Sequence, residues 1–119
     1  MSKIYTSYFA NWRNFPQNAV PIGITRYKPA YWDYPNIEGL SPSEQLLMSY
    51  KNKQIDEFVF KVKYLEELKE RNLKPEEILE GLYSAVGYRD IILCCYERPD
   101  EFCHRHILAE WLGGEIEEL

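Results

Sequence analysis

Four residues that can do chemistry lie close together in the last quarter of the chain. Glu97 directly follows an apolar run, and Cys103, His104 and Arg105 come a few residues later. A carboxylate, a thiol, an imidazole and a guanidinium supply a general acid or base, a nucleophile and a group that binds anions. Each of these residues can also have a purely structural role. Whether the role is chemical or structural depends on the strand, turn and helix that position the residues.

A strand, a turn and a helix are predicted to carry this cluster. Residues 90–96 are apolar without polar alternation, which is typical of a strand buried on both faces in the centre of a sheet. A tight turn is expected at 98–100. Residues 103–112 form an apolar helix pattern that the glycines at 113–114 end.

This order places the cluster at the C-terminal edge of the sheet. Glu97 lies at that edge, where ligands bind in open parallel sheets. Cys103 falls in the first turn of the helix, whose unpaired N–H groups favour an anion or a thiolate. Cys103 and His104 are expected to lean toward the sheet, and Arg105 to reach over the edge and pair with Glu97.

The rest of the chain predicts further strands and helices in alternation. Strands are expected at 3–9 and 19–26, with a last short strand at 114–119, and helices after Ser41, over 54–71 and from Pro75 to Gly81 or Gly87. Strands separated by helices imply an α/β fold. We therefore expect a single α/β domain over 1–119, a three-layer sandwich with a mainly parallel sheet flanked by helices.

Two of these helices have specific expected features. Ser41 is predicted to cap the first, with Pro42 at its first position and Glu44 completing a capping box. The helix over 54–71 has apolar residues at steps of three and four, which predicts one buried stripe. That stripe would comprise Ile55, Phe58, Val62, Leu65 and Leu68.

Composition excludes several classes of protein. The chain has 119 residues, 45% of them apolar and 28% charged, which is normal for a soluble globular domain. The net charge of −5 argues against broad nucleic-acid binding. No apolar run is long enough for a signal peptide or a membrane helix, so we expect no membrane association. Three cysteines, two of them adjacent, make a poor disulfide framework, and a reducing cytoplasm fits best.

The cluster resembles a known family, the domain-of-unknown-function family 488. The resemblance lies in Cys95-Tyr96-Glu97 at the end of the apolar strand, Pro99 in the turn, and Cys103-His104-Arg105 opening the helix. Upstream, Arg26 ends the second predicted strand, where many family members have Asp-Val-Arg and this chain has Ile-Thr-Arg. The resemblance implies an α/β fold and a shared polar site. It implies no particular reaction.

The candidate catalytic residues are Glu97, Cys103 and His104. Glu97 is expected to act as general acid, base or nucleophile, and Cys103 beside His104 as a possible second nucleophile. The alternative for Cys103 is a small half-buried side chain that only packs.

The candidate ligand-binding residues are Arg26, Arg105 and Tyr5. Together with Glu97, the two arginines can clamp a polar ligand; alternatively they form a buried ion-pair network. Tyr5 belongs to a group of N-terminal aromatic residues, with Tyr8 and Phe9, that can stack a base, or else pack as core.

The sequence does not predict a metal site. Its candidates are Cys94, Cys95, Cys103, His104 and His106. Structural zinc sites usually use paired Cys-x-x-Cys spacing, and adjacent cysteines of a strand point to opposite faces. We predict no metal and no cofactor.

Three functions remain open at this point. The leading one is a small enzyme acting on a nucleotide-like, nucleoside-like or other small anionic ligand at the sheet edge. The second is a module that binds such a ligand or a nucleic-acid end without chemistry. The third is a structural role, in which the Cys-His-Arg sequence only fixes the last helix. The oligomeric state is not predicted.

Overall fold

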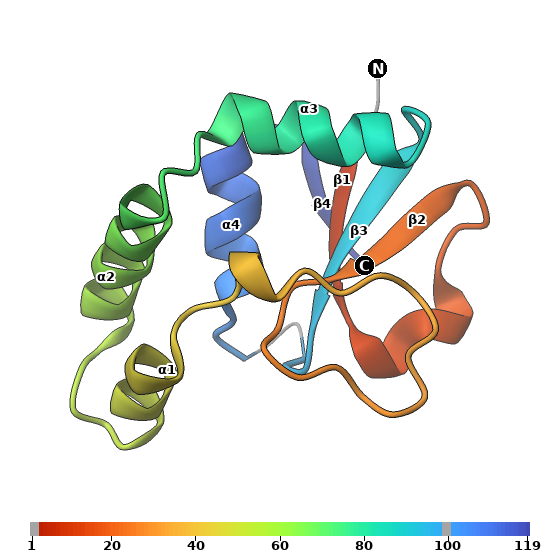
Figure 1. Ribbon diagram of the computed structural model, residues 1–119. Helices are drawn as coiled ribbons and strands as arrows, with labels where there is room; N and C mark the ends of the chain where they lie inside the picture. The colour runs from red at the N-terminus through yellow and green to blue at the C-terminus, as the bar shows by residue number, and fades with distance from the viewer. Residues whose placement is uncertain (1–2, 99–100) are drawn as a thin grey trace.

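A computed structural model describes residues 3–98 and 101–119. Its centre is a sheet of four parallel strands in the order β2-β3-β1-β4 (Figure 1). The strands are β1 (Ile4–Tyr8), β2 (Ala19–Gly23), β3 (Asp90–Cys95) and β4 (Ile116–Glu118). The expected strands at both ends of the chain and the central place of β3 are thus confirmed.

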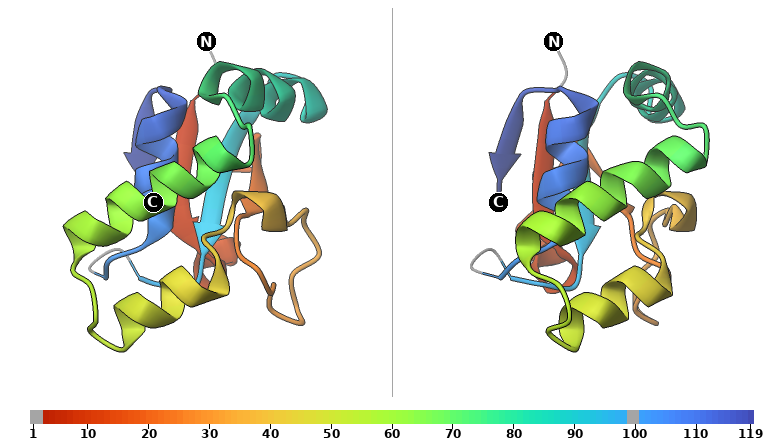
Figure 2. Two further views of the ribbon diagram at one scale, coloured as in Figure 1. Left: turned by 60° about the vertical axis from the view of Figure 1, so that its left-hand side comes forward. Right: turned by 90° about the vertical axis from the view of Figure 1, so that its left-hand side faces the viewer.

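The helices pack on one face of the sheet (Figure 2). They are α1 (Glu44–Lys51), α2 (Glu57–Glu70), α3 (Pro75–Ala85) and α4 (His104–Leu112). Ile91 and Leu93 of β3 face them, whereas Ile92 and Cys94 face the other way. That opposite face is covered by the 3-10 helix η1 (Phe9–Asn14) and by the loop that contains Trp32. The α/β sandwich is confirmed, with its second outer layer built from a short 3-10 helix and a loop.

The strand register brings the ends of the three longer strands to one edge. Tyr8 of β1 lies opposite Cys95, and Gly23 of β2 lies opposite Cys94. The chain leaves β2 through Ile24, whose N–H donates to the carbonyl of Cys94 at 3.0 Å. Residues 24–27 and 96–97 therefore lie beside each other at the C-terminal edge. Pro99 and Asp100 of the expected turn lie outside the described residues; the carbonyl of residue 98 accepts a hydrogen bond from the N–H of residue 101 at 3.0 Å.

The prediction that Ser41 caps the first helix is wrong. The N-cap is Ser43, whose hydroxyl oxygen accepts the N–H of Leu46 at 3.1 Å, and the helix starts at Glu44. The Ser41 hydroxyl donates instead to the carbonyl of Glu38 at 2.6 Å, closing the 3-10 helix η2 (Glu38–Leu40). Two serines, one on each side of a proline, offer the same capping signal, and the earlier one is used by the preceding turn.

The predicted buried stripe of α2 is only partly confirmed: Leu68 is buried and Ile55 and Leu65 pack partly buried against the core, whereas the other two residues are exposed. The buried residues of this helix are Phe60, Tyr64 and Leu68, and of these Leu68 alone had been predicted. Phe58 and Val62 are 73% and 40% exposed. The helix begins at Glu57, and Tyr64 turns inward to donate its hydroxyl to the buried carbonyl of Leu40 at 2.5 Å. A buried tyrosine with a partner for its hydroxyl fixes the rotation of the helix, whereas the spacing of the aliphatic residues allowed two rotations.

Three other boundaries follow their sequence signals. Pro75 starts α3 with two glutamates in its first turn, and Gly87 follows its end with φ 67°. Gly113 ends α4 in the left-handed conformation with φ 80°, which glycine adopts at little cost.

Candidate active site

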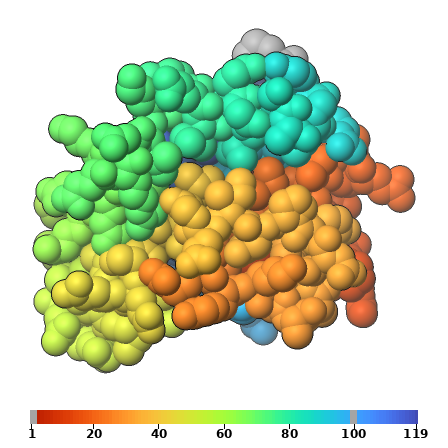
Figure 3. All heavy atoms as spheres, viewed as in Figure 1, coloured from red at the N-terminus to blue at the C-terminus, as the bar shows by residue number. Residues whose placement is uncertain are grey.

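Two adjoining cavities of about 370 and 300 Å³ lie at the C-terminal edge of the sheet. They share Leu47, Lys51, Glu97 and His104. The first, here called the thiol cavity, contains Cys103; the second, the arginine cavity, contains Arg26. In Figure 3 the loop after β2 and helix α1, both of which line the arginine cavity, lie side by side. Together the cavities reach the size that ligand sites usually have.

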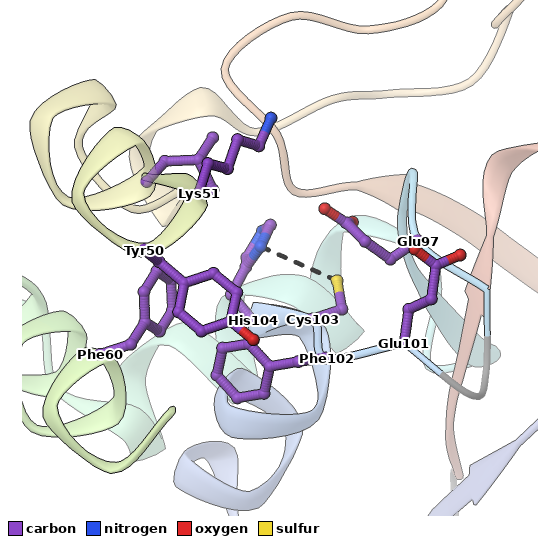
Figure 4. Close-up of a pocket in the computed structure, with 9 residues that line it drawn as sticks. Tyr50, Lys51, Phe60, Glu97, Glu101, Phe102, Cys103 and His104 are labelled. Atoms are coloured by element: carbon purple, nitrogen blue, oxygen red, sulfur yellow. Dashed lines mark hydrogen bonds between the residues drawn. The ribbon is translucent and has the colours of Figure 1, made fainter. Parts of the chain in front are cut away.

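Four of the predicted site residues meet here. Glu97, Cys103 and His104 line the thiol cavity, and Arg26 lines the arginine cavity with Glu97 and His104. Figure 4 shows the Lys51 and Glu97 side chains on opposite sides of the space in front of Cys103 and His104. The carboxyl ends of β2 and β3 and the start of α4 converge on this point, as parallel topology requires.

The imidazole of His104 is buried and held in one orientation. Its Nε2 lies 2.6 Å from the carbonyl oxygen of Ile24, so Nε2 carries the hydrogen and donates it. Nδ1 is then an acceptor, and it lies 3.9 Å from Sγ of Cys103 (Figure 4). Burial lowers the pKa of His104 to about 4, so the ring is neutral at pH 7. A neutral imidazole thus presents its lone pair to the thiol cavity beside a sulfur atom.

Cys95 and Cys103 are bonded to each other, although three cysteines, two of them adjacent, look like a poor disulfide framework in the sequence. Cys95 is the last residue of β3 on the helix-covered face, and Cys103 is the N-cap of α4 directly in front of it. Both side chains point into the same space. Cys94 points to the opposite face and stays free and buried, and burial raises the pKa of its thiol. An adjacent pair in a strand thus separates into one bonded and one isolated cysteine.

The five cysteine and histidine side chains that could bind a metal lie in different places. The ligand atoms of Cys95, Cys103 and His104 all lie within 4.8 Å of one another. Cys94 is on the other face of the sheet, and His106 contacts Glu118 at 2.9 Å. Three of the five candidates therefore converge.

Arg105 is fully buried and does not form the expected ion pair with the carboxylate of Glu97. Its Nη1 donates to the backbone carbonyl of Glu97 at 2.5 Å and to Sγ of Cys95 at 3.1 Å. Its carboxylate partner is Glu118 of β4, at 2.8 Å from Nη2. Burial alone would raise the pKa of Glu118, but hydrogen bonds from Arg105 and Thr6 outweigh it and hold that pKa below its usual value. Arg105 thus lies beneath the cavities and lines neither of them.

Arg26 is the predicted arginine that faces the cavities. Its Nη1 reaches Glu38 at 3.4 Å, and both side chains of this pair are partly exposed. Its Nε is buried and has no hydrogen-bond partner among residues 3–98 and 101–119. Lys51, in the last turn of α1, adds a second cation that lines both cavities. Sequence analysis missed Lys51, since nothing in its neighbourhood distinguishes it from other lysines on helix surfaces.

Tyr5 lies away from the cavities. It packs beneath the sheet with Phe9 and Trp32, on the face opposite the helices, and lines neither cavity. The aromatic residues at the site are Tyr27 and Tyr96, which are 70% and 53% exposed, and the Tyr96 hydroxyl donates to the carbonyl of Tyr27 at 2.8 Å. They come from the two chain segments that leave β2 and β3.

Comparison with known proteins adds one decisive observation. A family model, DUF488-N3a, described as "Active DUF488-N3 subclade", matches residues 9–115. The chain belongs to the DUF488 family. No curated protein and no solved structure gives a significant match.

The motif on which the resemblance rested surrounds the cavities of this DUF488 protein. Cys95 ends β3 and Glu97 follows it, while Cys103 is the N-cap of α4 and His104 and Arg105 are its first residues. The described residues that carry the resemblance therefore form one contiguous group in space. None of the helices in the described part of the chain is long and apolar enough to cross a membrane.

Proposed function

We propose that this DUF488 protein is a cytoplasmic enzyme that binds a nucleotide-like, nucleoside-like or other small anionic ligand at the sheet edge. The observation that carries the proposal is the Nε of Arg26, which is buried without a hydrogen-bond partner in the described part of the chain. An unsatisfied buried donor costs free energy, and an anion in the arginine cavity would remove that cost.

Charge and shape in the arginine cavity support the same ligand class. Arg26 and Lys51 both line it, and Tyr27 and Tyr96 add two aromatic rings. Two cations suit a phosphate or carboxylate, and exposed aromatic rings suit a planar heterocycle. Glu44 and Glu97 in the same lining restrict binding to ligands that also offer hydrogen-bond donors.

The groups that can do chemistry lie where the two cavities join. Glu97 and His104 line both cavities, and Cys103 lines the thiol cavity next to them. Glu97 is the proposed general acid or base, and His104 the neutral hydrogen-bond acceptor beside the sulfur. The description of the matched family as an active subclade fits an enzymatic role.

A thermal-shift screen with nucleosides, nucleotides, sugar phosphates and simple anions tests the binding. A ligand at one hundred times its Kd stabilises the protein by about 2.7 kcal/mol. In a chain of this size that raises the Tm by roughly 10 °C. Arg26→Gln should abolish the shift, whereas the matched control Arg13→Gln, outside both cavities, should keep it. A shift that survives in Arg26→Gln contradicts the proposed site.

A binding module without chemistry is the second candidate, because Cys103 is bonded and Arg105 is fully used by structural contacts. Glu97→Gln separates the two candidates once a ligand is known. An enzyme should bind the ligand but lose turnover in this variant. A binding module would show no turnover in the wild-type protein either.

A further inference from the structure

The two bonded cysteines differ in their access to the cavities. Cys103 lines the thiol cavity, whereas Cys95 is fully buried behind it and lines neither cavity. A substrate in the cavity can therefore reach the sulfur of Cys103 but not that of Cys95. Enzymes that exchange disulfides use one accessible thiol to attack the substrate and a second thiol to break the resulting mixed disulfide, and the two cysteines match these roles.

Each sulfur also has a group beside it that favours its thiolate form. Nη1 of Arg105 donates to Sγ of Cys95 at 3.1 Å, inside the protein, where a cation acts strongly. Cys103 is the N-cap of α4, a nine-residue helix whose N-terminus carries a partial positive charge, although the Cys103 side chain accepts no capping hydrogen bond. Nδ1 of His104 faces Sγ of Cys103 as a hydrogen-bond acceptor, since Nε2 carries the hydrogen and donates it to the carbonyl of Ile24. The thiolate is the form of cysteine that attacks a disulfide, so these surroundings favour exchange at both sulfurs.

The third cysteine is an internal comparison. Cys94 is adjacent in sequence, equally buried and free, but it points to the opposite face and lines neither cavity. The two bonded cysteines are thus the one that lines the thiol cavity at the start of α4 and the one that accepts a hydrogen bond from Arg105. A disulfide that only links β3 to α4 would need neither the cavity at Cys103 nor the hydrogen bond from Arg105 to Cys95.

We propose that Cys103 and Cys95 are a catalytic dithiol–disulfide couple and that the anionic ligand of the cavities is a small disulfide. The substrate class rests on the proposed function, since Arg26 and Lys51 would hold its carboxylate or phosphate. The couple itself rests on the two sulfurs and their surroundings.

The exchange proceeds in two displacements. The Cys103 thiolate attacks one sulfur of the substrate, the substrate S–S bond breaks, and the other half leaves as a thiolate that takes up the proton lost by Cys103. The Cys95 thiolate then attacks Sγ of Cys103, the mixed disulfide breaks, and the first half leaves as a second thiolate. The substrate gains two electrons and the protein loses two, ending with Cys95 bonded to Cys103, the state described here. A small dithiol reduces the pair for the next turnover.

The test uses the whole protein, reduced, with oxidised glutathione as the anionic probe and hydroxyethyl disulfide as the neutral probe. After acid quenching and alkylation, mass spectrometry should show the Cys95–Cys103 disulfide in the wild type. Cys95→Ser and Cys95→Ala should stop at a mixed disulfide on Cys103, and Cys103→Ser should form none. Cys94→Ala is the matched control and should behave as the wild type. Circular dichroism checks that each variant is folded.

The two probes separate this inference from the function on which it rests. Arg26→Gln should slow exchange with oxidised glutathione about tenfold, the value of one charge-assisted hydrogen bond, and leave the neutral probe unaffected. If Arg26→Gln exchanges with oxidised glutathione as fast as the wild type does, the proposal of an anionic substrate is wrong. The proposal of a dithiol–disulfide couple is unaffected by that result. Absence of exchange with either probe in folded protein would overturn the couple. So would stoichiometric zinc retained by the reduced protein, which would make Cys95, Cys103 and His104 a metal site.

Discussion

Acidification should destabilise the protein through one buried side chain, His104. Burial lowers its pKa from 6.5 to about 4 in the folded protein. As the pH falls below 6.5, the unfolded chain therefore binds a proton that the folded protein does not, and stability falls. Each pKa unit is worth about 1.4 kcal/mol, so the free energy of unfolding should drop by about 3 kcal/mol between pH 6.5 and pH 4. That is a large part of the stability of an ordinary domain.

Urea unfolding at several pH values from 7 to 4 measures this loss. The informative variant is His104→Gln, whose side-chain amide can still donate to the carbonyl of Ile24 but does not titrate. The variant should lose most of the pH dependence of the wild type across this window. His106→Gln, on the same helix but partly exposed, is the matched control.

Two results would refute this reasoning. One is a free energy of unfolding in the wild type that stays constant from pH 6.5 to 4.5. The other is a pH dependence that disappears in His106→Gln instead of His104→Gln. Glu118 affects only the measurements below about pH 4.5, because its lowered pKa means that its contribution is lost only there, so the range from pH 6.5 to 4.5 reports on His104.

Three further substitutions test the packing around the site. Arg105→Ala should lower the free energy of unfolding by about 3 kcal/mol, because it removes the cation beside Glu118 and the donor to the partly buried carbonyl of Glu97. Urea unfolding at pH 7 measures this loss, and a loss below about 1 kcal/mol would contradict the buried network. Tyr64→Phe should cost about 1 kcal/mol in the same assay, since the buried carbonyl of Leu40 loses its donor. Gly113→Ala should lower the Tm by a few degrees, because alanine is disfavoured at φ 80°, and an unchanged Tm would be the contrary result.

The strands were more predictable from sequence than the rotations of the helices. Residues 90–96 contain no polar alternation, and a strand of that kind has few places other than the centre of a parallel sheet. In α2, by contrast, Phe58 and Phe60 are equally apolar, and the helix pattern accommodates either as the buried one. The hydroxyl of Tyr64 decides between them by reaching Leu40, a contact between distant parts of the chain that local spacing does not encode.

The site was predictable in its location but only partly in its contacts. Topology alone places Glu97, Cys103 and His104 at one edge, because a strand that runs through a short turn into a helix leaves little freedom. The partner of Arg105 depends on β4, a three-residue strand near the C-terminus whose position along β1 no motif announces. The bond between Cys95 and Cys103 depends on the direction in which each side chain points, and the number and spacing of the cysteines do not predict that direction.

The pairing of the strands determines when the sheet can form during synthesis. Ile4 of β1 lies opposite Ile91 and Ile116, and Val20 of β2 also lies opposite Ile91. Neither of the first two strands has a neighbour until β3 has been made. At about 5 to 20 residues per second, the ribosome takes roughly 4 to 17 s to synthesise the chain from Ile4 to its partner Ile91. For that time the apolar N-terminal strands are exposed, which makes the nascent chain, and not the finished protein, the form that most needs protection by a chaperone.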